Sequence, residues 1–250
     1  MKPEKKESSE CAVIVSSFDG FADLWEPFFT LLFRYWPDCP YPIYLISNAK
    51  HFDHPRVTTL AIGADGKWAN NLFAALERIP ATSIIYMQDD FFLTQKVDTS
   101  KIQTFVDHAV KNSIACIRLF PEPGPDLPYP EPGLGMISQQ ADYRVSLQAH
   151  LWDIQALTSL MRPGESGWDM EIEGTKRAHA ADGIFLSVKE AAIRYTEGAT
   201  KGKWNIEALR HCREEGVALD RNARGTNYGI YYRAKRNRLR KAVKKFIGIS

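Results

Sequence analysis

The 250-residue sequence has few cysteines and no long apolar run. Its four cysteines stand far apart, and none forms a C-x-x-C pair or a Cys/His cluster with zinc-site spacing. This spacing excludes a disulfide scaffold and favours free thiols in a reducing compartment. No stretch approaches the ~18 to 20 continuous apolar residues of a membrane span, and the polar first ten residues lack the apolar core of a signal peptide. We therefore expect a cytoplasmic protein.

The sequence also has almost no net charge. Its 32 Lys and Arg against 30 Asp and Glu leave +2, which argues against a general binder of polyanions such as nucleic acid. The basic residues are unevenly placed, because eight of them and no acidic residue fall between Arg233 and Lys245. The rest of the chain is mildly acidic. A hydrophobic content of 44% and an aromatic content of 12% exclude a disordered chain and predict a substantial core.

Strand and helix patterns alternate through the first half of the chain. Short apolar runs predict strands, and apolar residues at helical spacing predict helices between them. This alternation predicts an α/β fold with a mostly parallel central sheet and helices on both faces. Ligands of such sheets bind at the carboxyl ends of the strands. The predicted strands are 11–17, 41–47, 57–62, 83–87 and 114–120, and the predicted helices are 21–36, 69–79 and 102–110. The polar residues at the strand ends are Ser17, Asp19, Asn48, Asp89 and Asp90.

The second half has a different composition. Residues 121–135 contain six prolines and three glycines, which is typical of a loop or a lid. A strand over 144–151, a short helix over 152–161 and an acidic turn at 163–174 that enters another helix are expected to follow. No internal repeat is present, so one domain is more economical than two.

Two adjacent carboxylates, Asp89 and Asp90, directly follow the apolar strand 83–87. Paired carboxylates at a strand end suit a hard divalent cation, which takes oxygen ligands and shares them with substrate phosphates. The alternative is a surface turn, where Asp is common. The bulky run Phe91–Leu93 places the pair at the edge of the core, which favours metal or phosphate chemistry.

The segment Tyr86-Met-Gln-Asp-Asp-Phe-Phe-Leu93 resembles the DxD region of GT-A-fold glycosyltransferases. With Val13-Ile-Val-Ser-Ser-Phe-Asp19, Trp68-Ala-Asn-Asn71 and the acidic segment 164–174, the resemblance covers residues 12–177 and is closest to bacterial transferases that build lipopolysaccharide or capsular polysaccharide. It implies a single GT-A-like, Rossmann-like catalytic domain over 11–227, after a polar leader at 1–10. Residues 11–120 would form its donor half, residues 121–227 its acceptor half, and 228–250 a basic tail helix.

The resemblance also implies residue roles. Gln88 stands where a strict DxD motif has Asp, which leaves Asp90 as the direct ligand of Mn²⁺ or Mg²⁺, while Asp89, the second acid of the metal motif, contacts ribose or sugar hydroxyls. The implied donor is a nucleotide sugar. Its expected contacts are Ser17, Asp19, Asn48, Trp68, Asn71 and Asp89. Asp19 with Gly20 also fits an ordinary turn, and Trp68 with Asn71 also fits an ordinary helix start.

Four carboxylates, Glu165, Asp169, Glu171 and Glu173, fall within nine residues. Asp169 matches a capping box with Ser166, and Glu173 can pair with Arg177 one turn later. Glu171 has neither explanation, so we favour it over Asp169 as the general base that an inverting transferase needs. Trp168, with Glu165, would form the acceptor platform. His150 and His179 stay open as further site residues.

The C-terminal segment combines an apolar stripe with basic faces. Phe246 belongs to the stripe, and Arg236, Arg240 and Lys244 lie on other faces. This pattern predicts a basic amphipathic helix on an anionic membrane surface, here the inner face of the cell membrane. The alternative is a terminal helix docked on the core.

Two other functions compete with a glycosyltransferase acting on a bacterial surface glycan or its lipid-linked precursor. A sugar nucleotidyltransferase needs a Gly-rich loop after the first strand, and the single glycine in Ser16–Gly20 argues against it. A non-catalytic module that binds a nucleotide sugar or a membrane remains the alternative from another class. A nucleic-acid partner is not expected, because the basic residues are concentrated in one terminal segment.

Overall fold

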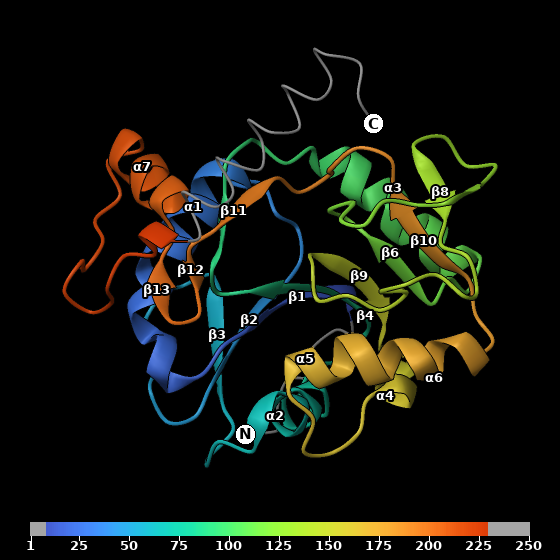
Figure 1. Cartoon of the computed structure of the whole chain (residues 1–250), viewed down its shortest axis with the longest axis horizontal. Coiled ribbons are helices and arrows are strands. Elements are labelled where there is room, and N and C mark those ends of the chain that lie inside the picture. The colour runs from blue at the N-terminus through green and yellow to red at the C-terminus, as the bar shows by residue number, and fades with distance from the viewer. Residues whose placement is uncertain (1–8, 230–250) are drawn as a thin grey trace, which may run out of the picture.

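A mixed sheet of nine strands forms the centre of residues 9–229, the part of the chain that the computed structural model describes (Figure 1). The strand order is β3-β2-β1-β4-β9-β6-β10-β8-β7, and all but β8 and β9 run in the same direction. The strands are β1 (Ser9–Ser16), β2 (Ile43–Ser47), β3 (Val57–Ala61), β4 (Ala81–Gln88), β6 (Cys116–Arg118), β7 (Leu127–Pro128), β8 (Leu134–Met136), β9 (His150–Asp153) and β10 (Phe185–Val188). The prediction of a mostly parallel α/β sheet is confirmed.

Helices cover both faces of this sheet. Figure 1 shows α2, α4 and α6 below the sheet, and α1, α3 and α7 above it. The helical segments are η1 (Asp19–Leu24), α1 (Trp25–Tyr35), α2 (Lys67–Leu76), α3 (Thr99–Lys111), α4 (Ile154–Leu160), α5 (Gly167–Asp169), the π-helical turn η2 (Met170–Gly174), α6 (Thr175–Ala180) and α7 (Ile206–Glu214). Two small sheets complete the described fold: β5 (Phe91–Leu93) with β11 (Tyr195–Glu197), and β12 (Ala199–Thr200) with β13 (Lys203–Trp204).

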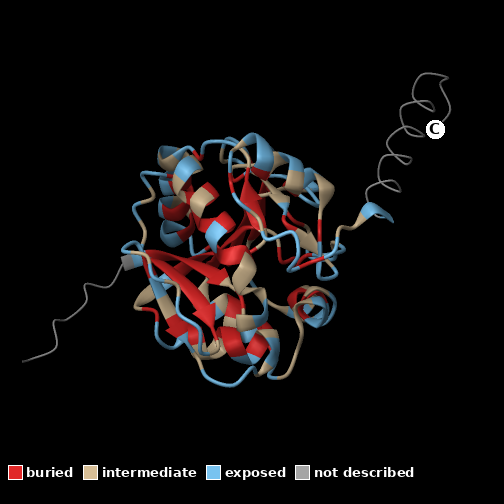
Figure 2. Ribbon diagram, turned by 90° about the vertical axis from the view of Figure 1, so that its left-hand side faces the viewer, coloured by how far each residue is buried: buried red, intermediate tan, exposed pale blue. Residues whose placement is uncertain are grey.

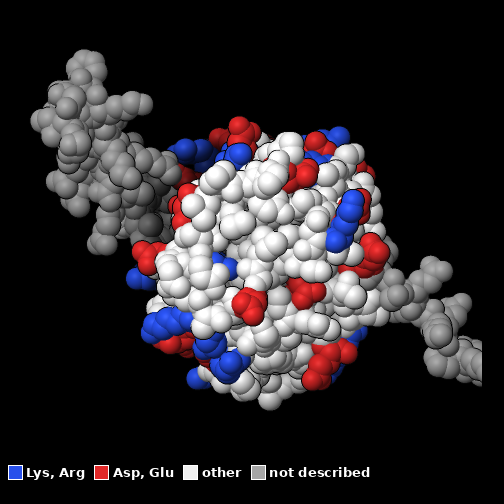
Figure 3. All heavy atoms as spheres, turned by 90° about the vertical axis from the view of Figure 1, so that its right-hand side faces the viewer, with Lys and Arg blue, Asp and Glu red and all other residues white. Residues whose placement is uncertain are grey.

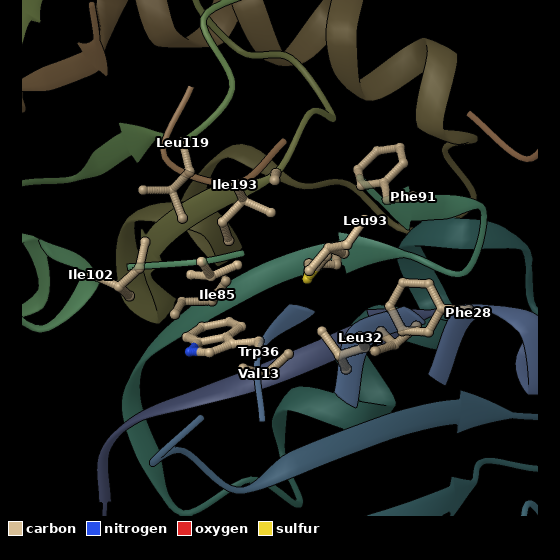
Figure 4. Close-up of a cluster of buried hydrophobic side chains, with 14 of the residues drawn as sticks. Val13, Phe28, Leu32, Trp36, Ile85, Phe91, Leu93, Ile102, Leu119 and Ile193 are labelled. Carbon is tan, nitrogen blue, oxygen red and sulfur yellow. The ribbon is translucent and has the colours of Figure 1, made fainter. Parts of the chain in front are cut away.

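The alternation of side chains along β1 divides the core in two. Val13 and Val15 point toward α1 and α3, whereas Ala12 and Ile14 point toward α2. All four side chains are fully buried, and Figure 2 shows the central strands buried between partly exposed helices. Figure 4 shows the first cluster, in which residues from strands and helices far apart in the sequence meet. Burying one large apolar side chain contributes about 1.5 to 3 kcal/mol, so both faces stabilise the fold.

Parts of the predicted secondary structure are wrong. The helix expected over 21–36 is a 3-10 segment up to Leu24 and an α-helix from Trp25, and Phe21 inside the first segment has non-helical backbone angles. The strand expected over 144–151 begins only at His150, since the amides of Val145 and Leu147 donate to side chains instead of a neighbouring strand. The short strands β5 and β10 were not expected.

The proline-rich segment 121–135 does not form a lid over either pocket described below. Its middle residues form β7 and its last two begin β8, which pairs with β7 and β10 at the outer edge of the sheet. None of its residues lines either pocket.

Within residues 9–229, no helix has the length and apolarity to cross a membrane. On the face shown in Figure 3, acidic and basic side chains are interspersed among uncharged areas. The tail residues Arg236, Arg240, Lys244 and Phe246 lie outside the described residues.

Candidate active site

Two adjoining pockets lie where β1 and β4 end. The larger has a volume of about 530 Å³ and the smaller about 260 Å³, and both are lined by Phe21, Trp68 and Gln88. The smaller pocket contains Ser17, Asp65, Lys67, Asn71 and Asp89. The larger contains Asp90, Gln148, Trp168, Glu171, Glu197 and Lys201. Four side chains predicted for the donor, Ser17, Trp68, Asn71 and Asp89, and two predicted for the acceptor and catalysis, Trp168 and Glu171, thus line neighbouring pockets of one groove. The predicted metal ligand Asp90 lines the larger pocket.

Asp89 is held from below by a short hydrogen-bond chain. The Trp25 indole donates to the Ser17 hydroxyl at 2.6 Å, and that hydroxyl donates to the Asp89 carboxylate. Asp89 is only 3% exposed. Burial and the neighbouring Asp90 charge raise the pKa of Asp89 well above its usual range, and the Ser17 hydrogen bond opposes this shift. The buried carboxylate is therefore fixed in orientation beneath the smaller pocket.

Asp90 turns the chain from β4 into β5 and faces the larger pocket. Its Oδ1 atom is buried and has no hydrogen-bond partner among the described residues. Burial, followed by the charge of Glu197, raises the pKa of Asp90 to about 7. A buried carboxylate oxygen without a partner is costly unless a cation or a donor completes it. Asp90 therefore has the strongest structural requirement for a ligand.

These residues fit a divalent cation only if another molecule completes its coordination. Among residues 9–229, no three His, Cys, Asp or Glu side chains converge to hold a metal ion. Mg²⁺ is commonly bound by one or two carboxylates together with substrate phosphates. The unpartnered Asp90 oxygen at the pocket wall suits that arrangement.

Glu171 lies in the π-helical turn η2, and such turns are frequent at functional sites. Its Oε1 accepts the Leu147 N–H at 2.7 Å, and its second oxygen has no hydrogen-bond partner among residues 9–229. Burial raises the pKa of Glu171, with the Leu147 hydrogen bond and Arg118 opposing the shift. One oxygen thus fixes the carboxylate at the pocket, and the other is available to a substrate.

The other three acidic residues of this segment have structural partners. Asp169 forms the predicted capping box with Ser166 and lines neither pocket. Glu165 binds Arg177 at 2.7 Å and also lies outside the pockets. Glu173 pairs with Lys176, not with the predicted Arg177, and is solvent-exposed.

Trp168 is 73% exposed at the mouth of the larger pocket. An aromatic ring of this size leaves apolar surface exposed to water, which is unfavourable unless a ligand covers it. Trp168 stands in α5, two residues before the π-helical turn η2 begins and three residues before Glu171. Trp168 and Glu171 thus line the same pocket, whereas Glu165, the other residue predicted for the acceptor platform, does not.

Asp19 and Asn48 bind each other instead of facing the groove. The Asp19 carboxylate accepts the N–H groups of Asn48, Ala49 and Lys50, and Asn48 Oδ1 accepts the Asp19 N–H. Desolvation raises the pKa of Asp19, but these three hydrogen bonds outweigh it and lower the pKa. Neither residue lines a pocket, so their donor contacts have no support from this geometry.

Trp68 and Asn71 stand at the start of α2, where they line the smaller pocket. The Trp68 indole donates to the Tyr86 hydroxyl at 2.9 Å. Asn71 donates to Asp65 at 2.8 Å and accepts the Gly66 N–H at 2.9 Å. The amide thus closes the 65–71 turn, and Asp65 itself is a pocket residue that the sequence patterns did not indicate.

Neither histidine left open above lines a pocket. His150 is fully buried and accepts a hydrogen bond from Arg118 Nε at 3.3 Å. Burial, then the Arg118 charge, lowers its pKa to about 3, so it is neutral. His179 contacts the Ala141 carbonyl at 3.1 Å.

Sequence reasoning missed the wall formed by residues 197–202. Glu197 ends β11, and the turn between β12 and β13 carries Lys201 at the edge of the larger pocket. Lys201 and Gly202 have φ angles of 52° and 73°, which are typical of a tight hairpin turn. The Lys-Gly pair was the available signal.

This sheet, with a groove at the carboxyl ends of its strands, defines a Rossmann-like α/β fold. The fold is similar to solved structures of S. aureus TarS. The TarS fragment 1–349 matches with a TM-score of 0.50 and 13% identity over 76% of this chain and 61% of that one. The complex of that fragment with UDP has a TM-score of 0.51 and 12% identity, covering 75% of this chain and 60% of the fragment. The complex with UDP-GlcNAc has a TM-score of 0.51 and 11% identity, covering 77% of this chain and 59% of the fragment. This chain thus spans about three fifths of those fragments. No protein-family model matches the sequence, and no curated protein matches it significantly.

Proposed function

We propose that this chain is a metal-dependent glycosyltransferase that moves a sugar from a nucleotide-sugar donor to a hydroxyl group. The observation that carries the proposal is the groove itself. It combines the unpartnered Asp90 oxygen, the anchored Glu171 carboxylate and the exposed Trp168 ring at the carboxyl edge of the sheet. The likeness to a fold that binds UDP and UDP-GlcNAc in S. aureus TarS supports a nucleotide-sugar donor.

Ser17, Trp68, Asn71 and Asp89 would bind the nucleotide in the smaller pocket. Asp90 would hold Mn²⁺ or Mg²⁺ together with the diphosphate, with Asp89 beside it. When bound, the cation would neutralise charge on the departing diphosphate. The smaller pocket is too small for a complete nucleotide sugar, so the sugar would extend into the larger pocket.

Glu171 would act as the general base. Its free oxygen would accept the proton of the acceptor hydroxyl while the hydroxyl oxygen bonds to the anomeric carbon. The bond from that carbon to the diphosphate oxygen would break, and the nucleoside diphosphate would leave with the electron pair. Such proton transfer contributes about 10² to 10⁴ in rate, and attack opposite the leaving group would invert the anomeric centre. The exposed face of Trp168 would stack on the acceptor sugar.

The acceptor in this proposal is a bacterial surface glycan or its lipid-linked precursor. The basic C-terminal segment would bring the protein to anionic lipid, where each basic residue near the surface contributes about 1 kcal/mol. Co-sedimentation with anionic vesicles, compared between the full chain and a chain ending at Tyr228, tests this step. Equal pelleting of both would remove the membrane from the proposal.

Thermal shift with nucleotides, with and without Mn²⁺, tests the donor site, because a ligand of the native state raises its stability by mass action. Wild type should be stabilised by a nucleoside diphosphate with Mn²⁺. Asp90→Ala should lose the Mn²⁺-dependent part, and Glu173→Gln should keep it because Glu173 lies outside both pockets. Nucleotide binding without turnover of any nucleotide sugar would favour the non-catalytic module.

A further inference from the structure

Two glutamines, Gln88 and Gln148, line the larger pocket. The protein binds the amide nitrogen of Gln88 and the amide oxygen of Gln148. Both are partly buried, and each has one end of its side chain bound by the protein. The chemistry of those bound ends determines which end is left for a ligand.

Gln88 is bound through its nitrogen. Its Nε2 donates to the Leu147 carbonyl oxygen at 3.1 Å. A carbonyl oxygen only accepts, so the amide nitrogen must face it. The Oε1 atom of Gln88 has no hydrogen-bond partner among the described residues and remains an acceptor at the pocket.

Gln148 is bound through its oxygen. The Tyr195 hydroxyl accepts the Ala149 N–H at 3.4 Å and donates its single proton to Gln148 Oε1. Tyr195 is itself fixed, because its ring stacks on Phe91 with centroids 4.1 Å apart and an angle of 12° between the planes. The amino group of Gln148 has no partner in residues 9–229 and remains a donor.

The two amides belong to one local arrangement. Gln88 binds the carbonyl of Leu147, the residue directly before Gln148, and both glutamines line the same pocket. Leu147 and Phe91 add apolar surface to the same wall. A ligand group that offers a donor, an acceptor and a small apolar end matches this wall.

We propose that Gln88 and Gln148 select a sugar that carries an acetamido group. This inference rests on the proposed function and names its substrate class. The acetamido N–H donates to Gln88 Oε1, its carbonyl accepts from Gln148 Nε2, and its methyl contacts the apolar wall. A hydroxyl at the same position places its donor and its acceptor on one oxygen and has no methyl, so it leaves the apolar wall uncovered. The acetamido sugar belongs either to the donor or to the acceptor.

The experiment compares ligands that differ only in this group. One arm measures the affinity of wild type for UDP-GlcNAc and UDP-Glc by titration calorimetry with Mn²⁺. The other arm measures binding of N,N′-diacetylchitobiose and cellobiose by saturation-transfer NMR with UDP present. The burial of the acetamido methyl against the apolar wall, with a separate atom for each glutamine, predicts about tenfold preference for the acetamido ligand in one arm. Preference in the first arm assigns the group to the donor, and preference in the second assigns it to the acceptor.

Two variants examine the mechanism of this preference. Gln148→Glu keeps an oxygen for the Tyr195 hydroxyl but replaces the donor by a second acceptor, so the preference should disappear while UDP affinity stays within about twofold. Tyr195→Phe frees the Gln148 amide to rotate and should reduce the preference several-fold. The melting temperature of this variant is measured as a control for folding. Equal affinity for both ligands of each pair, with UDP still bound, overturns the inference and leaves the proposed function standing. Absence of UDP binding and of any nucleotide-sugar turnover overturns both.

Discussion

Gln88 and Glu171 bind the carbonyl and the N–H group of the same residue, Leu147. Gln88 Nε2 donates to the Leu147 carbonyl at 3.1 Å, and Glu171 Oε1 accepts the Leu147 N–H at 2.7 Å. Gln88 immediately precedes the acidic pair, so Leu147 connects the proposed metal motif on β4 to the proposed base on η2. The position at which the DxD pattern fails thus has a structural role of its own, because an Asp side chain has no N–H to donate to a carbonyl.

Glu171→Gln should lower transfer by about two or more orders of magnitude, the usual contribution of a general base. Its amide oxygen can still accept the Leu147 N–H, so folding and donor affinity should be retained. Kinetics should therefore show a fall in kcat with little change in the KM of the donor. Glu173→Gln, a neighbour of the same turn that lies outside both pockets, is the matched control and should keep full activity. Loss of activity in Asp169→Asn but not in Glu171→Gln would identify the other carboxylate as the base.

The pH dependence of kcat should report the same carboxylate. A base acts in its deprotonated form, so activity should rise with pH through the pKa of Glu171, which burial raises above its ordinary value. The raised pKa also means that the folded state binds this proton more tightly than the unfolded state. The stability from Glu171 is thus present at low pH and lost as pH rises through the raised pKa. In Glu171→Gln, the residual kcat should no longer fall at acidic pH, and the unfolding free energy should lose the pH dependence that Glu171 causes. A residual kcat that still falls at acidic pH as in wild type would contradict the assignment.

Asp90→Asn should raise the melting temperature of the metal-free protein. The wild-type carboxylate has a buried oxygen without a partner, and the substitution removes the cost of burying that charge. The same variant should lose the stabilisation that Mn²⁺ with a nucleoside diphosphate gives to wild type. Thermal unfolding with and without both ligands measures the two effects together. A lower melting temperature without metal would mean that the carboxylate has a structural partner in solution.

Arg224 should control the shape of the groove from outside it. Its guanidinium binds both oxygens of Asp23 at 2.6 Å and lies 4.4 Å from the centre of the Phe21 ring, which lines both pockets. The Arg224 side chain is only 7% exposed, so Arg224→Ala leaves Asp23 without its partner and should cost about 3 kcal/mol in unfolding free energy. It should also weaken nucleotide binding because Phe21 loses its support. The double variant Asp23→Asn with Arg224→Met should recover part of the stability, and full additivity of the single effects would contradict the coupling.

The fold could be predicted where local pattern and burial agree. The strands around Val13 and Ile85 are apolar on both faces because both faces are covered, and continuous apolar runs indicate this directly. The absence of a strand before His150 could not be predicted, because the amides of that segment bind the side chains of Thr175 and Glu171, which are distant in sequence. Those contacts depend on tertiary packing, which leaves no local pattern.

The candidate site could be predicted at the strand end but not across the groove. Asp90 follows a buried strand, and Glu171 stands out among its neighbours because they have capping or ion-pair partners. The pattern at Asp19 does not separate a donor contact from a loop cap, and in the structure its carboxylate caps the loop after β2. Gln148 and Glu197 carry no local signal, and only the packing of the second half against β5 brings them to the pocket.

Release of nucleoside diphosphate from a panel of nucleotide sugars tests the central claim most directly. Wild type with Mn²⁺ and a glycan acceptor should release the diphosphate from at least one donor, and Glu173→Gln should match it. Asp90→Ala and Glu171→Gln should each fall by about 10² or more. Absence of release from every donor, or equal release by all four proteins, would contradict a glycosyltransferase that works through this groove.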